Sequence, residues 1–595
     1  MQRSNLESLL KKAKEFEKKY EWLQAAELYK KASSLALDQK DPLIAANLHE
    51  KMGFCFYRSA FQARDNVEFR KTIKKAILSY QEEYRLLEQI EEENNQSRIK
   101  HAQALIFYTK SWLETNIKKR KKLLDDWWTL EKEVLSTYEN NYDDQAVGRT
   151  CLNLLEGSLY YRFWIYLESP RSRKELVREC FYLAEKTIQK FSKLNNEHET
   201  TRGYCFAIFY LGFGGFFLAS KNEFKTLRSK ALDYSDKALE ISKKNEDAQL
   251  LSLIYLTACL TVSSVKNDYV SALNNINQSI KYAKITKDHF LIQYGKGVQS
   301  MMKLAGVRLI EDPDKQRETL ETISKTSQEQ INHSKTINHR HSICVGYNSY
   351  SNALTNLAQI EPDVKIKTEI LEKTINLLLK GTEEVKDWRQ FTGGFFGALS
   401  LNCYLLSETK QKNEEKRNLL RRSHKYLEKQ ISIQRKKFSS AYFIEAESYY
   451  RLALIQNGLA RIESDISQRS MLLEKAISYL GKCFDFVEKD KQVRSESTLT
   501  YGSVGIYYSR LGEMLQQLHS FTREKKRFKE AVDAYKKAIK SFKNTDLQTY
   551  SAASYWHLAQ LYDLQGDPKK ASQNYESAAQ AYDLASKKIP QLKDF

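Results

Sequence analysis

The sequence predicts an all-α chain, built as a solenoid of about twelve stacked helical hairpins. Composition is the first observation behind this prediction. The 595 residues include only 6 Pro and 21 Gly, so residues that break helices are rare. The second observation is a pattern of small residue, aromatic residue or Leu, and small residue, which recurs about every 50 residues with two shorter steps of about 40.

The recurring pattern marks the second helix of each expected hairpin. Small residues at helical spacing let paired helices approach closely, and the larger residue between them fills the adjoining gap. Clear copies are QAAELYKKA, with Ala25, Tyr29 and Ala32, and KEAVDAYKKA, around Tyr535. In chain order the second helices are expected to centre on Ala25, Ala76, Asp126, Cys180, Ala231, Ala272, Ser324, Thr374, Ser423, Ala476, Ala531 and Ala571.

Short polar segments stand ahead of several second helices. We expect them to form longer first helices or extended connecting turns; they are DNVEFRKTI, SPRSRKEL, QKNEEKRNLL, DISQRSML and REKKRFKE. No strand-rich stretch or Gly-rich linker interrupts the series. A lone hairpin cannot bury its apolar face, whereas stacked hairpins bury it in a continuous core. Residues 1–595 are therefore expected to form one continuous solenoid.

Three uncharged runs raise the question of a membrane span, since about 20 apolar residues suffice to cross a bilayer. They are GYCFAIFYLGFGGFFLAS (203–220), AQLLSLIYLTACLTVSSV (248–265) and QFTGGFFGALSLNCYLLS (390–407). Each falls ahead of a second-helix centre and contains polar residues, which favours a buried first helix over a span. The paired glycines in GGFF, at 214–217 and 393–396, indicate either close helix packing or a place where a partner's backbone approaches Gly214 or Gly394.

The segment SYWHLAQLYDLQGDPKKASQNYESAAQAY, residues 554–582, resembles the tetratricopeptide repeat, or TPR. The matching residues are Leu558, Ala559, Tyr562, Gly566, Ala571, Tyr575 and Ala578. The resemblance implies that the chain winds into a right-handed superhelix of TPR-like hairpins. It is closest in 431–595, whereas 1–245 have a period longer than 34 residues and 246–430 are degenerate. The first hairpin also resembles SNAP-type vesicle adaptors and MIT domains.

The TPR resemblance further implies that first helices line a concave binding groove. Carried onto this chain, the groove positions include Trp556, Gln560 and Asp563 in the last unit. Other expected partner-binding residues are Ser509, Gln516, Tyr450 and Asn457. The family's clamp for a C-terminal carboxylate uses Lys and Asn where this chain has Trp556 and Gln560, so that clamp is not expected. Aromatic and amide side chains suit an extended peptide or a helix.

Charge and cysteine content indicate the kind of surface and the cellular compartment to expect. Lys and Arg exceed Asp and Glu to give a net charge of +20, with KKRKK (118–122) the densest basic run. Lys and Glu alternate along most expected helices, which is typical of exposed faces. The 8 Cys are scattered without a C-x-x-C pair, which favours a reducing compartment. The first 22 residues lack an apolar signal core, so a cytoplasmic location is expected.

Motifs for chemistry do not emerge from the sequence. We find no phosphate-binding G-x-x-x-x-G-K-[ST], no G-x-S-x-G and no H-E-x-x-H. The local histidines His333, His339 and His341 are expected to lie at the surface or in turns rather than on a metal. The sequence thus predicts no enzyme activity, no cofactor and no metal site.

A cytoplasmic scaffold that binds a peptide or helix of a protein partner is the leading hypothesis. Nucleic-acid binding is the alternative that the +20 charge and the 36 Tyr suggest. A regulatory sensor acting with a separate effector, or a SNAP-like adaptor, are further alternatives. No stable membrane insertion is expected, and the sequence leaves the oligomeric state and the partner open.

Overall fold

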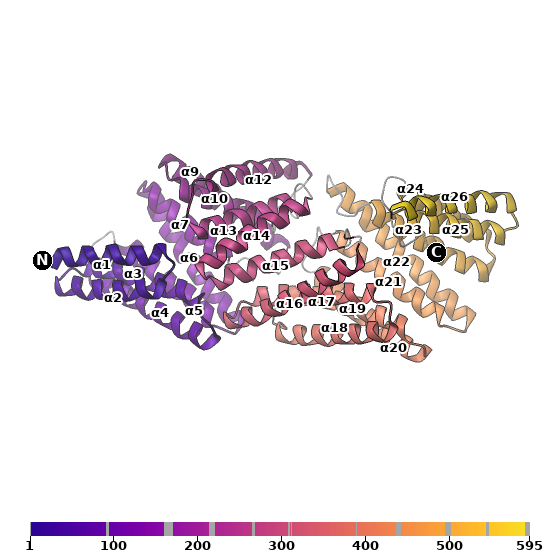
Figure 1. Cartoon of the computed structure of the whole chain (residues 1–595), viewed down its shortest axis with the longest axis horizontal. Helices are drawn as coiled ribbons and strands as arrows, with labels where there is room; N and C mark the ends of the chain where they lie inside the picture. Colours follow the sequence, from indigo (N-terminus) through magenta and orange to yellow (C-terminus); the bar gives the residue numbers. More distant parts are fainter. Residues whose placement is uncertain are drawn as a thin grey trace. The chain divides into compact units, whose positions relative to one another are not determined.

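The computed structural model of the chain describes residues 2–90, 95–159, 170–212, 221–263, 268–307, 310, 312–387, 389–435, 442–493, 501–542 and 547–588. Within these ranges the regular structure is helical and contains no strand, which confirms the predicted all-α class (Figure 1).

Long helices follow one another with short connections. In chain order they are α1 (Gln2–Lys18), α2 (Trp22–Asp38), α3 (Pro42–Ala60), α4 (Asn66–Glu88), α5 (Gln96–Leu113), α6 (Ile117–Asn140), α7 (Asp144–Gly157), α9 (Pro170–Lys193), α10 (Glu197–Tyr210), α12 (Lys221–Ser242), α13 (Ala248–Thr261), α14 (Tyr269–Thr286), α15 (His289–Gly306), α16 (Pro313–Thr336), α17 (Arg340–Ile360), α18 (Val364–Glu384), α19 (Arg389–Thr409), α20 (Asn413–Arg435), α21 (Tyr442–Arg461), α22 (Ile466–Val493), α23 (Tyr501–Thr522), α24 (Lys525–Phe542), α25 (Gln548–Leu564) and α26 (Pro568–Lys588).

The chain divides into two compact units. The first comprises residues 1–310, 314–356 and 381–391, and the second comprises 311–313, 357–380 and 392–595. Each expected second-helix centre lies in the second member of a successive helix pair, from Ala25 in α2 to Ala571 in α26. The number of hairpins and the hand of the superhelix stay predictions.

Most of the centres are buried as expected. Ala76, Cys180, Ala231 and Ala272 have no exposed surface, which is what close helix contact through small residues requires. Two centres were placed wrongly by one residue. Asp126 and Ser324 are only half-buried, whereas their neighbours Trp127 and Ile323 point into the core.

The polar segments ahead of the second helices are neither longer first helices nor extended turns, so that prediction was wrong. They form the opening turns of the second helices themselves. DNVEFRKTI begins with Asp65, whose carboxylate accepts a hydrogen bond from the Glu68 amide at 2.8 Å and so caps α4. The second helices are consequently long: α4 has 23 residues and α22 has 28.

Several connections between helices share one backbone conformation. Non-glycine residues with φ between +53° and +59° follow the end of a helix, among them Lys40, Tyr142 and Asn195. The amide of the following residue donates a hydrogen bond to a carbonyl in the last turn of the helix. For example, the Asp41 amide donates to the Ala36 carbonyl at 3.0 Å. Left-handed backbone costs a non-glycine residue about 1 kcal/mol or more. The tight reversal therefore occurs here without the glycine that usually marks it.

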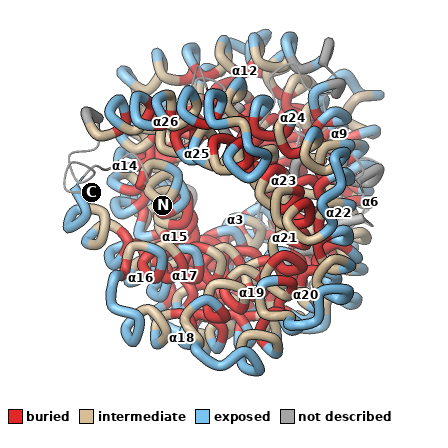
Figure 2. Tube along the Cα trace, turned by 90° about the vertical axis from the view of Figure 1, so that its right-hand side faces the viewer, coloured by how far each residue is buried: buried red, intermediate tan, exposed pale blue. Residues whose placement is uncertain are grey.

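The uncharged runs lie in first helices, as predicted for the residues that the structure describes. Most of α13 and α19 is buried, and Figure 2 shows α19 in red beside the pale blue turns of α18. Among the described residues, no helix is long and apolar enough to cross a membrane. The first run continues past α10 into residues 213–220, which lie outside the described residues.

Ion pairs join the second helices of neighbouring hairpins. In the first unit Lys132 of α6 lies 2.7 Å from Glu179 of α9, and Arg178 of α9 lies 3.1 Å from Glu223 of α12. The partners are 47 and 45 residues apart, close to the repeat period. Exposed pairs of this kind contribute about 0–1 kcal/mol each, so they balance charge along the surface more than they hold the fold together.

Contacts across the first unit join segments that are far apart in the sequence. The Gln62 amide group donates to the carbonyls of both Tyr20 and Thr286, at 2.9 and 2.8 Å. The His289 backbone amide donates to the Phe61 carbonyl at 2.9 Å. A solenoid whose repeats touch only their neighbours makes no such contacts. The ends of α3 and α14 therefore meet in this unit.

An aromatic cluster forms at the same meeting point. The ring centroids of Phe61 and Trp112 are 5.1 Å apart, and Trp112 stacks on His339 at 6.1 Å. Phe290, at the start of α15, lies within 6.3 Å of Phe61. Such rings contribute large buried area, so inward-facing ends of α3, α5 and α15 fill the interior of this unit with their own side chains.

Candidate interaction surface

Successive first helices in the second unit contact each other through one repeated position. Tyr450 of α21 packs against Tyr507 of α23, with ring centroids 4.5 Å apart. One hairpin later Ser509 of α23 contacts Ser554 of α25, with 3.2 Å between the hydroxyl oxygens. Tyr450 and Ser509 each stand two residues before the Leu of their helix's Leu–small pair, and each meets a residue four before the next Leu. Both predicted groove residues therefore belong to the contact with the following hairpin.

Trp556 occupies the same position in the last hairpin. Half of its surface is exposed to solvent. It packs edge-on against Tyr575 of α26, with ring centroids 4.9 Å apart. A hollow of about 440 Å³ lies beside the pair, lined by Thr549, Ala552, Ala553, Trp556, Tyr575, Ala578, Ala579 and Tyr582. We call this hollow between α25 and α26 the terminal groove.

Other predicted residues take part in hydrogen bonds within the second unit. Gln516 accepts a hydrogen bond from the Tyr535 hydroxyl at 2.7 Å, and Asp563 accepts one from the Tyr575 hydroxyl at 2.8 Å. Gln560 lies 3.3 Å from the His557 ring. These contacts join the two helices of one hairpin or neighbouring turns of one helix. Their role toward a partner stays a prediction.

The remaining predicted residues do not gather with Trp556. Asn457 is buried in α21, and Gly394 is exposed on α19. Its neighbour Gly393 faces α20, where an added Cβ would lie 3.2 Å from Cγ2 of Ile433. Gly393 thus fits the close-packing interpretation of GGFF. Gly214 lies outside the described residues.

Charged groups flank the Tyr450–Tyr507 contact of α21 and α23. Burial lowers the pKa of the Arg510 guanidinium, but Glu513, 2.7 Å away, raises it, and the net pKa lies above the ordinary value. Burial raises the pKa of the Tyr450 hydroxyl, which lies near that guanidinium. These groups therefore keep one charge state across physiological pH, and the surface around them is permanently polar.

Comparison with known proteins identifies the C-terminal part of the chain. Residues 510–583 match the family model described as tetratricopeptide repeat. The chain is a TPR-like helical repeat protein in this segment. The match confirms the resemblance predicted from residues 554–582 and extends it over α24 and most of α23.

Two solved structures are similar at 14% sequence identity. One is BtubC (BKLC) from P. vanneervenii, with a TM-score of 0.32 over 44% of this chain and 90% of that chain. The other is the APC/C hetero-tetramer Cut9–Hcn1, with a TM-score of 0.33 over 94% of this chain and 95% of that chain. No curated protein matches the sequence.

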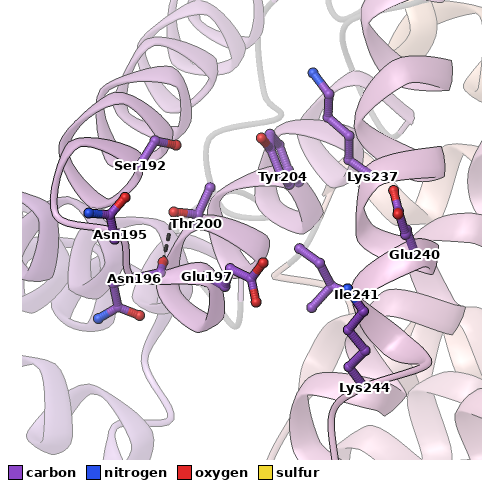
Figure 3. A pocket seen from close by; sticks show the side chains of 10 residues that line it. All are labelled: Ser192, Asn195, Asn196, Glu197, Thr200, Tyr204, Lys237, Glu240, Ile241 and Lys244. Atoms are coloured by element: carbon purple, nitrogen blue, oxygen red, sulfur yellow. Dashed lines mark hydrogen bonds between the residues drawn. The ribbon is translucent and has the colours of Figure 1, made fainter.

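The first unit contains a polar hollow, which differs from the apolar terminal groove of the second unit. Figure 3 shows a hollow of about 510 Å³, lined by Ser192, Asn195, Asn196, Glu197, Thr200, Tyr204, Lys237, Glu240, Ile241 and Lys244. Thr200 donates to the Asn196 carbonyl at 2.8 Å, within the first turn of α10. Two carboxylates and two ammonium groups face this hollow, so it presents no single charge to a ligand.

His339 lies in the connection between α16 and α17, as expected for a turn, but it is buried, and Trp112 and Phe290 pack on it. His341 is buried within α17, so its expected place at the surface or in a turn was wrong. Burial, together with His289 and Lys296, lowers the pKa of His333 to about 4. In the part of the chain that the structure describes, no group of three His, Cys, Asp or Glu could hold a metal.

The densest basic run is interrupted in the structure. Arg120, in the middle of KKRKK, is buried, whereas Lys118, Lys119 and Lys122 are exposed. Burial, together with Arg340, lowers the pKa of Arg120 to about 9. The run therefore does not present a continuous basic stripe.

Sequence reasoning found one wall of the terminal groove but not the other. Trp556 came from the TPR positions of the first helix. Tyr575 and Ala578 were identified as family residues but were assigned to packing inside the hairpin. The repeat register could have identified them, because the same position in α24, Tyr535, contacts His557 of α25.

Proposed function

We propose that the chain is a non-catalytic scaffold that binds a peptide or helical segment of a protein partner. The observation that carries this proposal is Trp556, half exposed over the apolar terminal groove of a TPR-like segment. Interfaces concentrate their binding energy in a few aromatic residues set in small apolar pockets. Trp556 has that setting.

Chemistry of the groove wall favours a protein segment over a small polar ligand. Ala552, Ala553, Ala578 and Ala579 present methyl groups, while the aromatic rings supply area at low conformational cost. Polar atoms that could read a charged group are few along this wall. A segment with apolar side chains on one face would bury them here.

Affinity purification of the full-length chain from its native cells, with quantitative mass spectrometry, tests the proposal. We expect at least one protein to be enriched and its recovery to fall about thirtyfold with Trp556→Arg, since truncation or charge at a central aromatic costs about 2 kcal/mol or more. Leu584→Arg is the matched control, because Leu584 is 54% exposed on α26 and does not line the groove. If no specific protein is recovered, the proposed scaffold function is wrong. If a partner is recovered equally well with Trp556→Arg, the scaffold function stands and only the assignment of the binding site to the terminal groove is wrong.

A further inference from the structure

The hairpin before the terminal groove shows how such a groove is filled. α25 packs against both α23 and α24, because Leu558 and Leu561 of α25 share one core cluster with Leu515 of α23 and with Tyr535 of α24. Tyr550 of α25 stacks on Phe542 with ring centroids 5.9 Å apart, and His557 stacks on Tyr535 at 6.0 Å. Ser554, between them, contacts Ser509. The residues of α25 that enter this groove are thus an aromatic, a small and an aromatic residue at positions i, i+4 and i+7.

The terminal groove repeats the aromatic and small residues of the second-helix wall. In α24 the sequence runs Ala531, Tyr535, Ala538 and Phe542, and in α26 the same spacing gives Ala571, Tyr575, Ala578 and Tyr582. On the first-helix side, Trp556 corresponds to Ser509, so the second groove has an indole at its centre instead of a hydroxyl. Two flanking positions also differ, since Ile506 and Ile539 correspond to Ala553 and Ala579.

We propose that the terminal groove binds an amphipathic helix of a partner protein, seated as α25 is seated on α23 and α24. This inference rests on the scaffold function proposed above and specifies its partner. The helix presents an aromatic residue, a small residue and an aromatic residue at i, i+4 and i+7, which fall on one helical face. The small residue faces Trp556, because the indole takes up space that the Ser509 hydroxyl leaves open in the preceding groove.

Continuity with the interface inside the chain supports this occupant. Ser554, Leu558 and Leu561 of α25 are each at most 2% exposed in the preceding interface. By contrast Ala553, Trp556 and Ala579 of the terminal groove are exposed. A helix is the occupant that the same walls hold one hairpin earlier. An extended strand would leave its backbone groups unpaired against a wall of alanine methyl groups.

A labelled peptide with the sequence of residues 547–565, which form α25, is the probe. It is titrated with the full-length chain and its fluorescence anisotropy is measured. We expect saturable binding, and about tenfold weaker binding of a peptide with Ser554→Leu, because the added side chain collides with the indole. The chain variant Trp556→Ser restores the small central residue of the preceding groove and should restore binding of the Ser554→Leu peptide. The Leu584→Arg chain should bind both peptides as the unmodified chain does.

Several results would overturn the proposal. Binding of neither peptide, or a Ser554→Leu effect that Trp556→Ser leaves unchanged, would show that the groove does not take a helix in this register. A chain truncated after Lys588 that binds the peptide more than about tenfold more tightly would make residues 589–595 the occupant. Self-association of the chain that Trp556→Arg abolishes would make it a second copy. Because the probe is a defined peptide, its failure is distinguishable from failure to find a cellular partner.

Discussion

The guanidinium of Arg58 lies 3.1 Å from the carboxylate of Asp288, although 230 residues separate them in the chain. Both side chains are almost fully buried, at 1% and 3% exposure. Arg58 also lies 3.6 Å from Glu156, which in turn pairs with Arg202 at 2.6 Å. Charged groups from four separate segments of the first unit therefore form one network around the place where α3 meets α15.

Removal of Arg58 should destabilise the first unit strongly. Arg58→Met leaves Asp288 as a buried carboxylate without its guanidinium, and loss of one partner of a buried pair costs about 3–5 kcal/mol. We expect a clear decrease in the urea midpoint of the transition that reports on this unit. Arg178→Met, which removes an exposed partner of Glu223, should change the free energy of unfolding by about 1 kcal/mol or less and so leave the urea midpoint nearly unchanged.

The double variant Arg58→Met with Asp288→Asn tests the charge alone, because an Asn side chain can still accept the hydrogen bond from the Leu291 amide that caps α15. Replacement of both charged groups by neutral ones should recover most of the stability, because no isolated charge remains buried. If the double variant is as unstable as Arg58→Met, the guanidinium acts through its other contacts and not through Asp288.

Stability should decrease above neutral pH through His198. Hydrogen bonds to Asp247 and Glu199 raise the pKa of His198 to about 9 from an ordinary 6.5. A histidine whose pKa is raised on folding stabilises fully below the unfolded value, and this contribution is lost as pH rises from about 6.5 through 9. Because the ring is more than a third exposed, the loss should be about 1 kcal/mol or less. The urea midpoint measured at pH 6 and pH 9.5 should fall less in His198→Gln than in the unmodified chain.

At acid pH the partner of His198 gives the opposite dependence. Burial opposes the shift, but the hydrogen bond from His198 prevails and lowers the pKa of Asp247 to about 2 from 3.8. The stabilisation is present above about pH 3.8 and is lost as pH falls toward 2. The urea midpoint should fall less between pH 5 and pH 2 in Asp247→Asn than in the unmodified chain. An equal fall would show that other carboxylates cause the loss of stability at acid pH.

All eight cysteines should resist modification in the folded chain. Each is completely buried, and burial raises the pKa of Cys205 and of Cys259 to about 12. The reactive thiolate is therefore scarce and inaccessible at pH 8. Titration with a disulfide reagent should detect almost no thiol in native buffer and eight in guanidinium chloride. Rapid reaction of one thiol in native buffer would identify a site that opens locally.

Local packing was readable from the sequence because it is periodic. Small residues such as Ala76 and Ala231 mark helix contacts through their size, wherever the hairpin lies. The helix reversals were harder to find, since Lys40 and Tyr142 adopt a left-handed backbone that normally signals glycine. Among the described residues, the last hairpin has the expected glycine, Gly566, at φ +76°, whereas the reversal between α23 and α24 uses Arg523.

Long-range contacts could not be read in the same way. The Arg58–Asp288 pair depends on small rotations accumulated over many hairpins, which no local pattern encodes. A similar limit applied to the candidate site. Family positions predicted a partner groove at Trp556, which is half exposed, and the same prediction was made for the equivalent residues Tyr450 and Ser509, which lie against the following hairpin. Whether a position faces a partner or the next repeat depends on what stacks after it.

Two helical glycines of the second unit should respond to alanine in opposite directions. A Cβ at Gly512 would lie 2.6 Å from Cε1 of Tyr535, whose ring is fully buried and whose hydroxyl is bonded to Gln516. Because that ring is held at both ends, Gly512→Ala should destabilise by about 1–3 kcal/mol. A Cβ at Gly481 on α22 would meet no atom within 4 Å, so Gly481→Ala should stabilise by about 0.5–1 kcal/mol through its higher helix propensity.

Urea unfolding of the full-length variants, followed by circular dichroism, measures both effects. The Gly512→Ala variant should unfold at lower urea and the Gly481→Ala variant at higher urea than the unmodified chain. The pair is matched, since both glycines lie inside helices of neighbouring hairpins. If Gly512→Ala also stabilised the chain, α23 and α24 would have to move apart by several tenths of an ångström without loss of stability. The requirement for a small residue beside Tyr535, on which the stacking of α25 also depends, would then be wrong.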